Sequence, residues 1–255
     1  MLAKRSSASL GHRWPLAFGA VLMASMVALG SPSVLAQTGR PAAARPLPRP
    51  APVYTAMLRT GEQGSHIMGN PEARVRLAEY VSYTCPHCAH FAADATQTLR
   101  TAYVARGTVS LEVRHVVRDP VDLAMATATN CGAPARFFSR HEAMMGQHEA
   151  IMARVRALPQ ATLEQWGALP MAQRLRRVAD DSGVTAWMRG RGFTAAQMNQ
   201  CLSDMTLAQR LIDQSNQAAT VGVQGTPSFT INGTLVPNAY SWAALRPALD
   251  TALAR

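Results

Sequence analysis

Two cysteines, Cys85 and Cys88, are separated by two residues and follow an apolar segment that is typical of a buried strand. This pattern places Cys85 at the start of a helix, where unpaired backbone N–H groups and the positive end of the helix dipole converge. A thiolate is stabilised there, so the pKa of Cys85 should fall and its sulfur should be an accessible, good leaving group. Cys88 lies almost one turn further on and should be buried. The spacing therefore predicts a redox-active pair rather than a structural disulfide.

The two residues between the cysteines suit the same chemistry. Pro86 fits the first turn of a helix, where its missing N–H would have no partner in any case. His87 adds a hydrogen-bond donor, or a positive charge when it is protonated. Haem attachment would require a histidine directly after Cys88, and Ala89 stands there instead, so the sequence excludes that function.

A metal site is the alternative interpretation from a different functional class. The cysteine pair together with His87 and His90 could bind zinc or copper. A zinc site would normally have a second cysteine pair, whereas Cys131 and Cys201 stand far apart in the sequence. The ligands would also have to converge from a single helical turn. We therefore predict redox chemistry with no metal and no cofactor, and keep a metal-binding or copper-handling module as the alternative.

The elements that position the cysteines can be predicted from periodicity and turn signals. The strand before them is rich in β-branched and aromatic residues, and a helical pattern follows as far as Gly107. From about residue 120 to 222 the pattern is helical throughout. The order of elements predicts an α/β fold, with a sheet core and a large helical insertion in one structural unit. The expected strands cover residues 53–58, 65–68, 75–83, 109–117, 228–231 and 234–236.

The C-terminal segment predicts one more helix. Ser241 is a good capping residue, and Leu245, Leu249 and Leu253 would share one face of the helix. Pro247 lies inside this pattern and cannot donate a helical hydrogen bond, so we expect a kink or a late start.

The segment Glu79–Cys88 reads Glu-Tyr-Val-Ser-Tyr-Thr-Cys-Pro-His-Cys and resembles the DsbA-type thiol–disulfide oxidoreductases of bacterial envelopes. Pro-His between the cysteines is that family's characteristic dipeptide. The segment 225–229, Gly-Thr-Pro-Ser-Phe, looks like the family's cis-proline loop. The resemblance implies a thioredoxin fold over residues 53–255, with a large helical insertion at about residues 120–222. It also implies that the Thr226–Pro227 peptide bond is cis and faces the cysteines.

The resemblance also implies roles for individual residues. Cys85 would be the nucleophile and Cys88 the resolving thiol. Glu79 matches the buried strand acid that helps to move a proton on and off the resolving cysteine. Thr226 would offer backbone pairing to an extended substrate peptide beside Pro227.

The direction of the reaction is less well specified by this resemblance. Strongly oxidising DsbA-type members tend to have valine where this chain has Thr226, and threonine there is also seen in isomerase-like relatives. Residues 37–68 are too short and proline-rich for the globular dimerisation domain of an isomerase. We expect an oxidase that acts on secreted proteins, and an isomerase or reductase kept in the dithiol form is the alternative.

The two remaining cysteines, Cys131 and Cys201, bracket the helical block. In an oxidising compartment two such cysteines are expected to form a structural disulfide. The bridge would close a loop of about seventy residues and, in the chain-entropy model, would stabilise the fold by ~4 kcal/mol. Two separate buried thiols are the alternative.

The N-terminus has the organisation of an export signal. Lys4, Arg5 and Arg13 form a positively charged region, and the apolar stretch Trp14–Leu29 follows. Residues 34–36, Val-Leu-Ala, are typical of a cleavage site. We predict a signal peptide over residues 1–36 and a periplasmic location; a retained N-terminal membrane anchor is the alternative.

The net charge and the linker bear on the partners. The chain has 255 residues and a formal charge of +10, but seven basic residues and no acidic residue fall within residues 1–60. The charge therefore belongs mostly to the N-terminus, and we predict no nucleic-acid partner. Residues 37–52 are rich in Pro, Ala and Arg and should form an extended linker. The expected partners are reduced or misoxidised exported proteins. The resemblance adds a membrane redox partner, either a quinone-linked oxidase or an electron donor.

Overall fold

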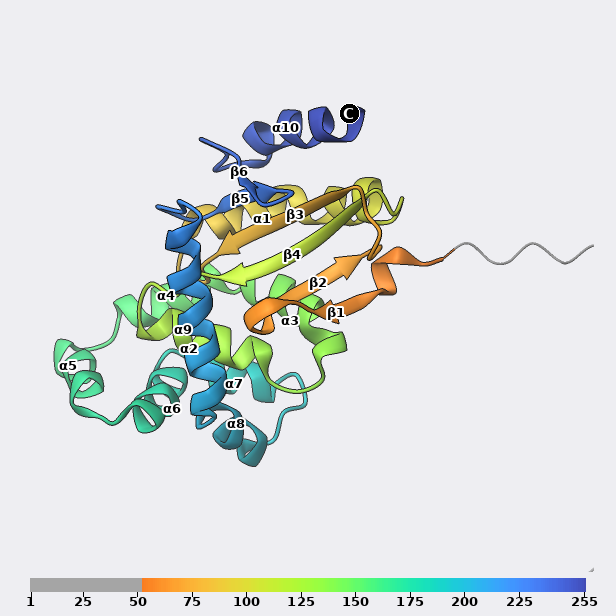
Figure 1. The fold of residues 1–255 in the computed structure, drawn as a ribbon. Coiled ribbons are helices and arrows are strands. Elements are labelled where there is room, and N and C mark those ends of the chain that lie inside the picture. Colours follow the sequence, from red (N-terminus) through yellow and green to blue (C-terminus); the bar gives the residue numbers. More distant parts are fainter. Residues whose placement is uncertain (1–51) are drawn as a thin grey trace, which may run out of the picture. The chain divides into compact units, whose positions relative to one another are not determined.

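The computed structural model describes residues 52–255, so the predicted signal peptide and all but the last residue of the predicted linker lie outside the described residues. The described part contains a six-stranded sheet with strand order β1-β2-β4-β3-β5-β6 (Figure 1). The strands are β1 Leu58–Thr60, β2 His66–Gly69, β3 Val75–Val81, β4 Val109–His115, β5 Ser228–Ile231 and β6 Thr234–Leu235.

The strand before the cysteines, β3, lies in the middle of this sheet. It pairs in parallel with β4 and antiparallel with β5, and the remaining neighbours in the sheet are also antiparallel. Arg76 is the only exposed residue of β3, as is expected for a strand covered on both faces. The end of β3 is therefore held rigidly, and so is the turn that carries the cysteines.

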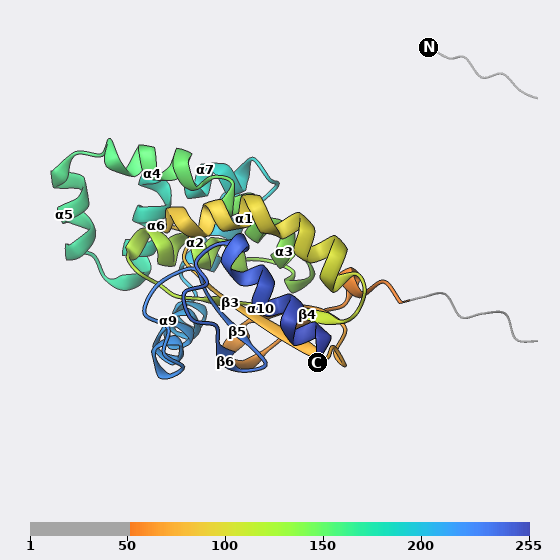
Figure 2. The same cartoon turned by 90° about the horizontal axis from the view of Figure 1, so that it is seen from above.

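Helices cover both faces of the sheet. Leu77 and Val81 of β3 belong to the main core together with Phe91 of α1 and Leu249 of α10. Ala78 on the opposite face clusters with Ala218 of α9. The other helices lie together to one side of the sheet in both views (Figures 1 and 2). The helices are α1 Pro86–Thr98, α2 Pro120–Asn130, α3 Phe137–Met145, α4 His148–Arg156, α5 Gln160–Ala168, α6 Met171–Asp181, α7 Val184–Arg189, α8 Ala195–Leu202, α9 Met205–Thr220 and α10 Trp242–Ala254, and a π-helical segment at Leu99–Val104 follows α1. Among the described residues, no helix has both the length and the apolar character needed to cross a membrane.

The predicted α/β architecture, a thioredoxin fold with a large helical insertion, is confirmed. Several strand boundaries were predicted wrongly. Residues 53–57 are not a strand: Tyr54–Ala56 form a 3-10 helical turn, and the pairing of β1 with β2 begins only at Leu58 opposite Met68. The strand β3 ends at Val81 rather than at residue 83, because the N–H of Tyr83 donates to a side chain of α2 instead of to the sheet.

The C-terminal helix corrects another expectation. Ser241 caps α10 by accepting a hydrogen bond from the N–H of Ala244, as predicted, and the helix starts immediately afterwards at Trp242. Pro247 therefore lies inside the helix, so the late start that we expected as one possibility is wrong, and the kink, the other possibility, stays a prediction. Pro247 is exposed, so water can reach the helical carbonyl that lacks its usual donor.

The predicted structural disulfide is present. Cys131 and Cys201 are bonded across 70 residues of sequence, with their Cα atoms 5.8 Å apart. Cys131 is the residue that ends α2, and Cys201 lies in the last turn of α8. The bond therefore joins the first long helix of the insertion to the next to last.

Candidate active site

The two cysteines of the motif lie where β3 passes into α1. Cys85 is the capping residue of α1, with extended backbone angles, and Pro86 is the first residue of the helix. The N–H groups of Cys88 and Ala89 donate to the carbonyl of Cys85, which fixes the turn. Both Cys85 and Cys88 are free thiols. The predicted position of the pair at a helix start is correct.

The structure corrects the expected accessibility of the first sulfur. Cys88 is fully buried, as predicted, but Cys85 is only 3% exposed because the loop before Pro227 packs against it. Cys85 nevertheless borders a surface cleft of about 610 Å³. A partner would therefore approach Cys85 through this cleft.

The environments of the two thiols are strongly asymmetric. The pKa of Cys85 is lowered from 9.0 to about 4, chiefly by a hydrogen bond from the Cys88 thiol, against the effect of burial. The side chain of Thr226 and the backbone N–H groups of Cys88 and His87 lower it further. Burial raises the pKa of Cys88 well above its usual range, and its interaction with Cys85 adds to that rise. One sulfur is therefore prepared to carry negative charge and the other to hold its proton.

The loop before β5 completes the wall around Cys85. The Thr226–Pro227 peptide bond is cis, and the Cys85 thiol donates a hydrogen bond of 3.1 Å to the carbonyl oxygen of Thr226. The sheet register explains this contact, because Ser228 pairs with Tyr80 and the loop consequently reaches the end of β3. The predicted cis peptide bond facing the cysteine is thus present.

Glu79 lies on β3 and is 5% exposed, so the predicted strand acid is buried. Burial raises the pKa of its carboxyl from 4.5 to about 8. Its charge contributes to the raised pKa of Cys88, so the two groups interact. A carboxyl with a pKa of about 8 is mostly neutral at pH 7, where it can give up its proton to the resolving thiolate, and its ionised form can take a proton back.

His87 contributes differently from its expected role. Its ring is exposed, and the part that lowers the pKa of Cys85 is its backbone N–H. Pro86 is also exposed beside it. Among residues 52–255, no three side chains of His, Cys, Asp or Glu gather as a metal site requires.

Comparison with known proteins agrees with this geometry. The family model described as thioredoxin matches residues 61–251, which is most of the chain. The chain belongs to the thioredoxin family. A crystal structure of a protein-disulfide isomerase from Novosphingobium aromaticivorans is 38% identical and has a TM-score of 0.73, covering 75% of this chain and 98% of that one. The structure of Wolbachia pipientis alpha-DsbA1 shares the fold at 16% identity and a TM-score of 0.60, covering 76% of this chain and 94% of that one.

Curated relatives from Rickettsia bear names in the same class. A chain of Rickettsia bellii named as a protein-disulfide oxidoreductase is 24% identical over 75% of this chain and 66% of its own length. One of Rickettsia typhi with the same type of name is 26% identical over 73% of this chain and 61% of its own length. The chain therefore spans less than two thirds of the length of these relatives. The resemblance to DsbA-type members of the thioredoxin family is confirmed at the level of family and fold.

Sequence reasoning missed Asp122, a buried acid in the first turn of α2. Its carboxylate accepts hydrogen bonds from the hydroxyl of Ser82 at 2.6 Å and from the N–H groups of Tyr83 at 2.8 Å and Arg118 at 3.1 Å. Burial raises its pKa to about 7. The run Asp-Pro-Val-Asp at 119–122, a capped helix start, is the available signal. By itself that run indicates the end of a strand and the start of a helix, but no role for the second acid.

Tyr83 was also missed, although it closely precedes the motif. In addition to its bond with Asp122, its hydroxyl pairs with Nδ1 of His141 at 2.8 Å. Its carbonyl accepts a hydrogen bond of 2.9 Å from Nδ1 of His148. Tyr83 therefore contacts α2, α3 and α4 at once, and the insertion fixes the strand end that leads to Cys85. No local pattern in the sequence indicates these long-range contacts.

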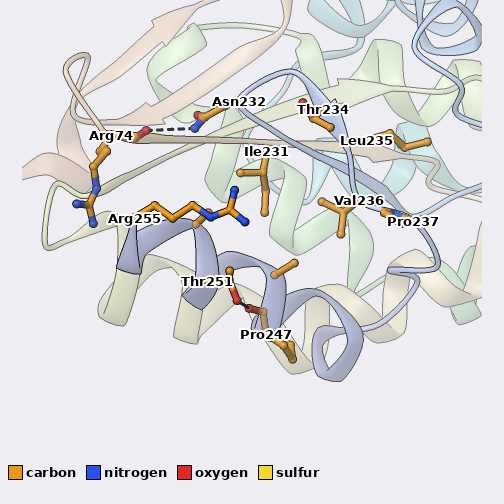
Figure 3. A pocket seen from close by; sticks show the side chains of 12 residues that line it. Arg74, Ile231, Asn232, Thr234, Leu235, Val236, Pro237, Pro247, Thr251 and Arg255 are labelled. Atoms are coloured by element: carbon orange, nitrogen blue, oxygen red, sulfur yellow. Dashed lines mark hydrogen bonds between the residues drawn. The ribbon is translucent and has the colours of Figure 1, made fainter.

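A second cavity, of about 780 Å³, lies between the β5–β6 hairpin and α10 (Figure 3). Arg74 and Arg255 lie at one end of it, and Ile231, Leu235 and Val236 supply apolar walls. Neither motif cysteine lines this cavity, so we assign the thiol chemistry to the cleft beside Cys85.

Proposed function

We propose that this member of the thioredoxin family is an enzyme, a protein thiol–disulfide oxidoreductase that exchanges a Cys85–Cys88 disulfide with cysteines of other proteins. The observation that carries the proposal is the opposed pKa shift of the two thiols, lowered for Cys85 and raised for Cys88. Such a pair has one good leaving group and one buried resolving thiol. The names of the Rickettsia relatives and of the Novosphingobium protein support the same activity.

The exchange proceeds through a mixed disulfide. A client thiolate attacks the sulfur of Cys85, the Cys85–Cys88 bond breaks, and Cys88 leaves with the electron pair. Cys88 then takes up a proton, which its high pKa favours and which the neutral carboxyl of Glu79 can supply. A second client thiolate attacks the client sulfur of the mixed disulfide, and Cys85 leaves as a thiolate. The client gains one disulfide, and the enzyme is left as the dithiol.

The proposed client lies extended beside the loop before β5. Sγ of Cys85 lies 3.1 Å from the carbonyl oxygen of Thr226. Neither the Cys85 thiolate present at neutral pH nor a Cys85–Cys88 disulfide has a proton to donate to this carbonyl, so the carbonyl can accept an N–H of an extended client, as in strand addition. The cis Pro227 then holds the client backbone beside the reactive sulfur.

We propose the oxidase direction. A thiolate stabilised at neutral pH stabilises the dithiol relative to the disulfide, and this makes the disulfide oxidising. An isomerase is the second candidate, because the Novosphingobium protein is named as one and Thr226 precedes the cis proline. A reductase would, like an isomerase, be kept in the dithiol form. The redox state of Cys85 and Cys88 in freshly isolated cells distinguishes these candidates. A pair that is mostly disulfide supports the oxidase, and a pair that is mostly dithiol supports the isomerase or reductase.

The proposed location is the periplasm, after removal of residues 1–36. The charged and apolar pattern of that segment supports export. A membrane partner, quinone-linked for an oxidase, would regenerate the active form. N-terminal sequencing of the protein from a periplasmic fraction tests the location, and a mature chain beginning at Gln37 is the expected result.

A trapping experiment tests the proposed activity. In the Cys88→Ser variant the Cys85 thiolate can attack a client disulfide and release one client thiolate, and no Cys88 thiol is present to resolve the adduct, so mixed disulfides with disulfide-containing clients should accumulate on Cys85. A Cys85→Ser variant is the matched control and should trap none. If Cys88→Ser forms no mixed disulfide with a protein that contains a reactive disulfide, the proposed function is wrong.

A further inference from the structure

The cleft beside Cys85 has a chemical character that goes beyond a simple passage to the sulfur. Small side chains give it apolar walls: Val116 directly after β4, Ala218 and Ala219 at the end of α9, and Val223 after that helix. Its volume of about 610 Å³ falls within the range of roughly 300–1,000 Å³ typical of ligand sites. The walls leave room for a side chain of a bound polypeptide.

The charge in this cleft is unbalanced. Arg118 lines the cleft and is exposed, and no acidic side chain is found among the described residues that line it. Arg118 forms none of the ion pairs found among residues 52–255. The backbone of Arg118 is nevertheless fixed, because its N–H donates to Asp122.

The acids nearest to Arg118 in sequence are committed to other donors. Asp122 is buried and accepts three hydrogen bonds, from Ser82, Tyr83 and Arg118 N–H. Asp119 accepts from the hydroxyl of Thr84 and from the N–H of Asp122. The guanidinium of Arg118 is therefore available to a ligand.

The end of α9 does not supply the missing acceptors. The carbonyl of Ala218 accepts from the N–H groups of Val221 and Val223, and that of Ala219 accepts from Gly222. The closing turn thus satisfies the last carbonyls of the helix before they reach the cleft. In the disulfide form, which has no Cys85 thiolate, the positive charge of Arg118 borders a cleft with apolar walls whose described lining residues include no counter-ion.

We propose that this cleft selects client segments that carry an acidic side chain a few residues from the reacting cysteine, with the client carboxylate paired to Arg118. The inference rests on the proposed function and deepens it by naming a class of client. An Arg–carboxylate pair would orient the extended segment, so that its cysteine is presented to Cys85. An apolar client side chain would fill the space beside Val116 and Val223.

Synthetic peptides test the inference. Each peptide carries two cysteines and differs from the others at one position, which holds Glu, Gln or Lys. Since an extended chain advances about 3.3 Å per residue, moving that position over about three residues on each side of the attacking cysteine scans the cleft. The measured quantity is the second-order rate constant for reduction of the Cys85–Cys88 disulfide, at low and at high salt.

For the unmodified enzyme we expect the best Glu peptide to react about fivefold faster than its Lys counterpart at low salt, with the ratio falling toward one at high salt. Arg118→Gln should remove the preference, and Arg118→Glu should reverse it. Arg189→Glu on α7 makes the same change in net charge at an exposed site and should keep the original ratio. Each ratio compares two peptides with the same enzyme variant, so a change in the fraction of active protein affects both rates equally and leaves the ratio unchanged.

Three outcomes overturn the inference. They are equal rates for Glu and Lys peptides with the unmodified enzyme, a preference that survives in Arg118→Gln, and an Arg189→Glu effect as large as that of Arg118→Glu. In each of them the Gln peptide still reacts, so the proposed function stands while the acidic selectivity fails. An enzyme inert toward every peptide overturns both.

Discussion

The hydroxyl of Tyr83 lies 2.8 Å from Nδ1 of His141, and both side chains are buried in the core. Tyr83 precedes the nucleophile by two residues, whereas His141 belongs to α3. This contact links the insertion directly to the strand end that carries Cys85. Its consequence is that the helical insertion helps to position the active-site turn as well as to enlarge the core.

Removing the Tyr83 hydroxyl should therefore weaken the fold. Tyr83→Phe keeps the ring but leaves Nδ1 of His141 without its partner in a buried site, so we expect a loss of about 1–3 kcal/mol in the free energy of unfolding. Urea denaturation measures this change. Tyr240→Phe removes a hydroxyl from a side chain in a 53% exposed residue and is the control, expected to change little. Equal effects of the two variants would contradict the structural role of Tyr83.

The reactivity of Cys85 should persist far into acid. With its pKa lowered to about 4, the dithiol enzyme should react with a small alkylating reagent at a rate that falls to half near pH 4 rather than near pH 9. Cys88→Ala removes the hydrogen bond that contributes most, so the midpoint should move upward. Because the folded pKa is depressed, the stabilisation by this thiolate is complete above about pH 9 and lost as pH falls through about 4. A midpoint near 9 in the unmodified dithiol would contradict the assignment.

For Glu79 we expect the stability of the fold to depend on pH with the opposite sign. Its folded pKa is raised to about 8 from 4.5, so its buried carboxyl binds a proton that the unfolded chain has released. Wild-type stability should consequently decline as pH rises from about 4.5 to 8, and Glu79→Gln should remove that component of the decline. Thermal unfolding across this pH range measures it. Glu164→Gln, at an exposed site on α5, should leave the wild-type slope. The same slope in Glu79→Gln would show that this carboxyl titrates normally.

The disulfide between Cys131 and Cys201 should stabilise the fold without taking part in exchange. Replacing both residues with alanine should cost about 4 kcal/mol in the chain-entropy model, because a loop of about seventy residues is released in the unfolded chain. Urea unfolding of the double variant measures the loss. The rate of peptide oxidation by the folded double variant should match that of the parent. A matching loss of the oxidation rate would place this disulfide in the reaction.

The redox motif could be predicted from the sequence because its physics is local. The position of Cys85 at a helix start, the fit of Pro86 to the first turn and the burial of Cys88 all follow from a few adjacent residues. Thr226 and Pro227 lie far along the chain, and only the resemblance to a known family connected them with the cysteines. The disulfide between the other two cysteines followed from counting and from the expected compartment.

Other features could not be predicted because they depend on packing between distant elements. The carboxylate of Asp122 bonds to Tyr83 across 39 residues of sequence, and no periodicity indicates that contact. The low exposure of Cys85 results from the loop that packs over it, which a motif cannot show. The polarity of the cleft likewise depends on Arg118 lying beside the end of α9.

The buried histidines should make the fold sensitive to acid. His66, His115 and His141 surround the ring of Phe137, and burial lowers the pKa of each, that of His141 to about 3. Histidines with depressed pKa values stay neutral in the fold and gain protons on unfolding. Stability should therefore be complete above about pH 6.5 and fall as the pH decreases toward 3.

His141→Gln tests this dependence, because glutamine does not titrate. Thermal unfolding between pH 7 and 4 should show a shallower loss of stability for this variant than for the parent, even if its stability at pH 7 is lower. His90→Gln replaces an exposed histidine of α1 and should keep the parental slope. Because the slope reports protons taken up on unfolding, it separates titration from the packing lost in the substitution. Parallel slopes for the parent and His141→Gln would mean that other groups cause the acid sensitivity.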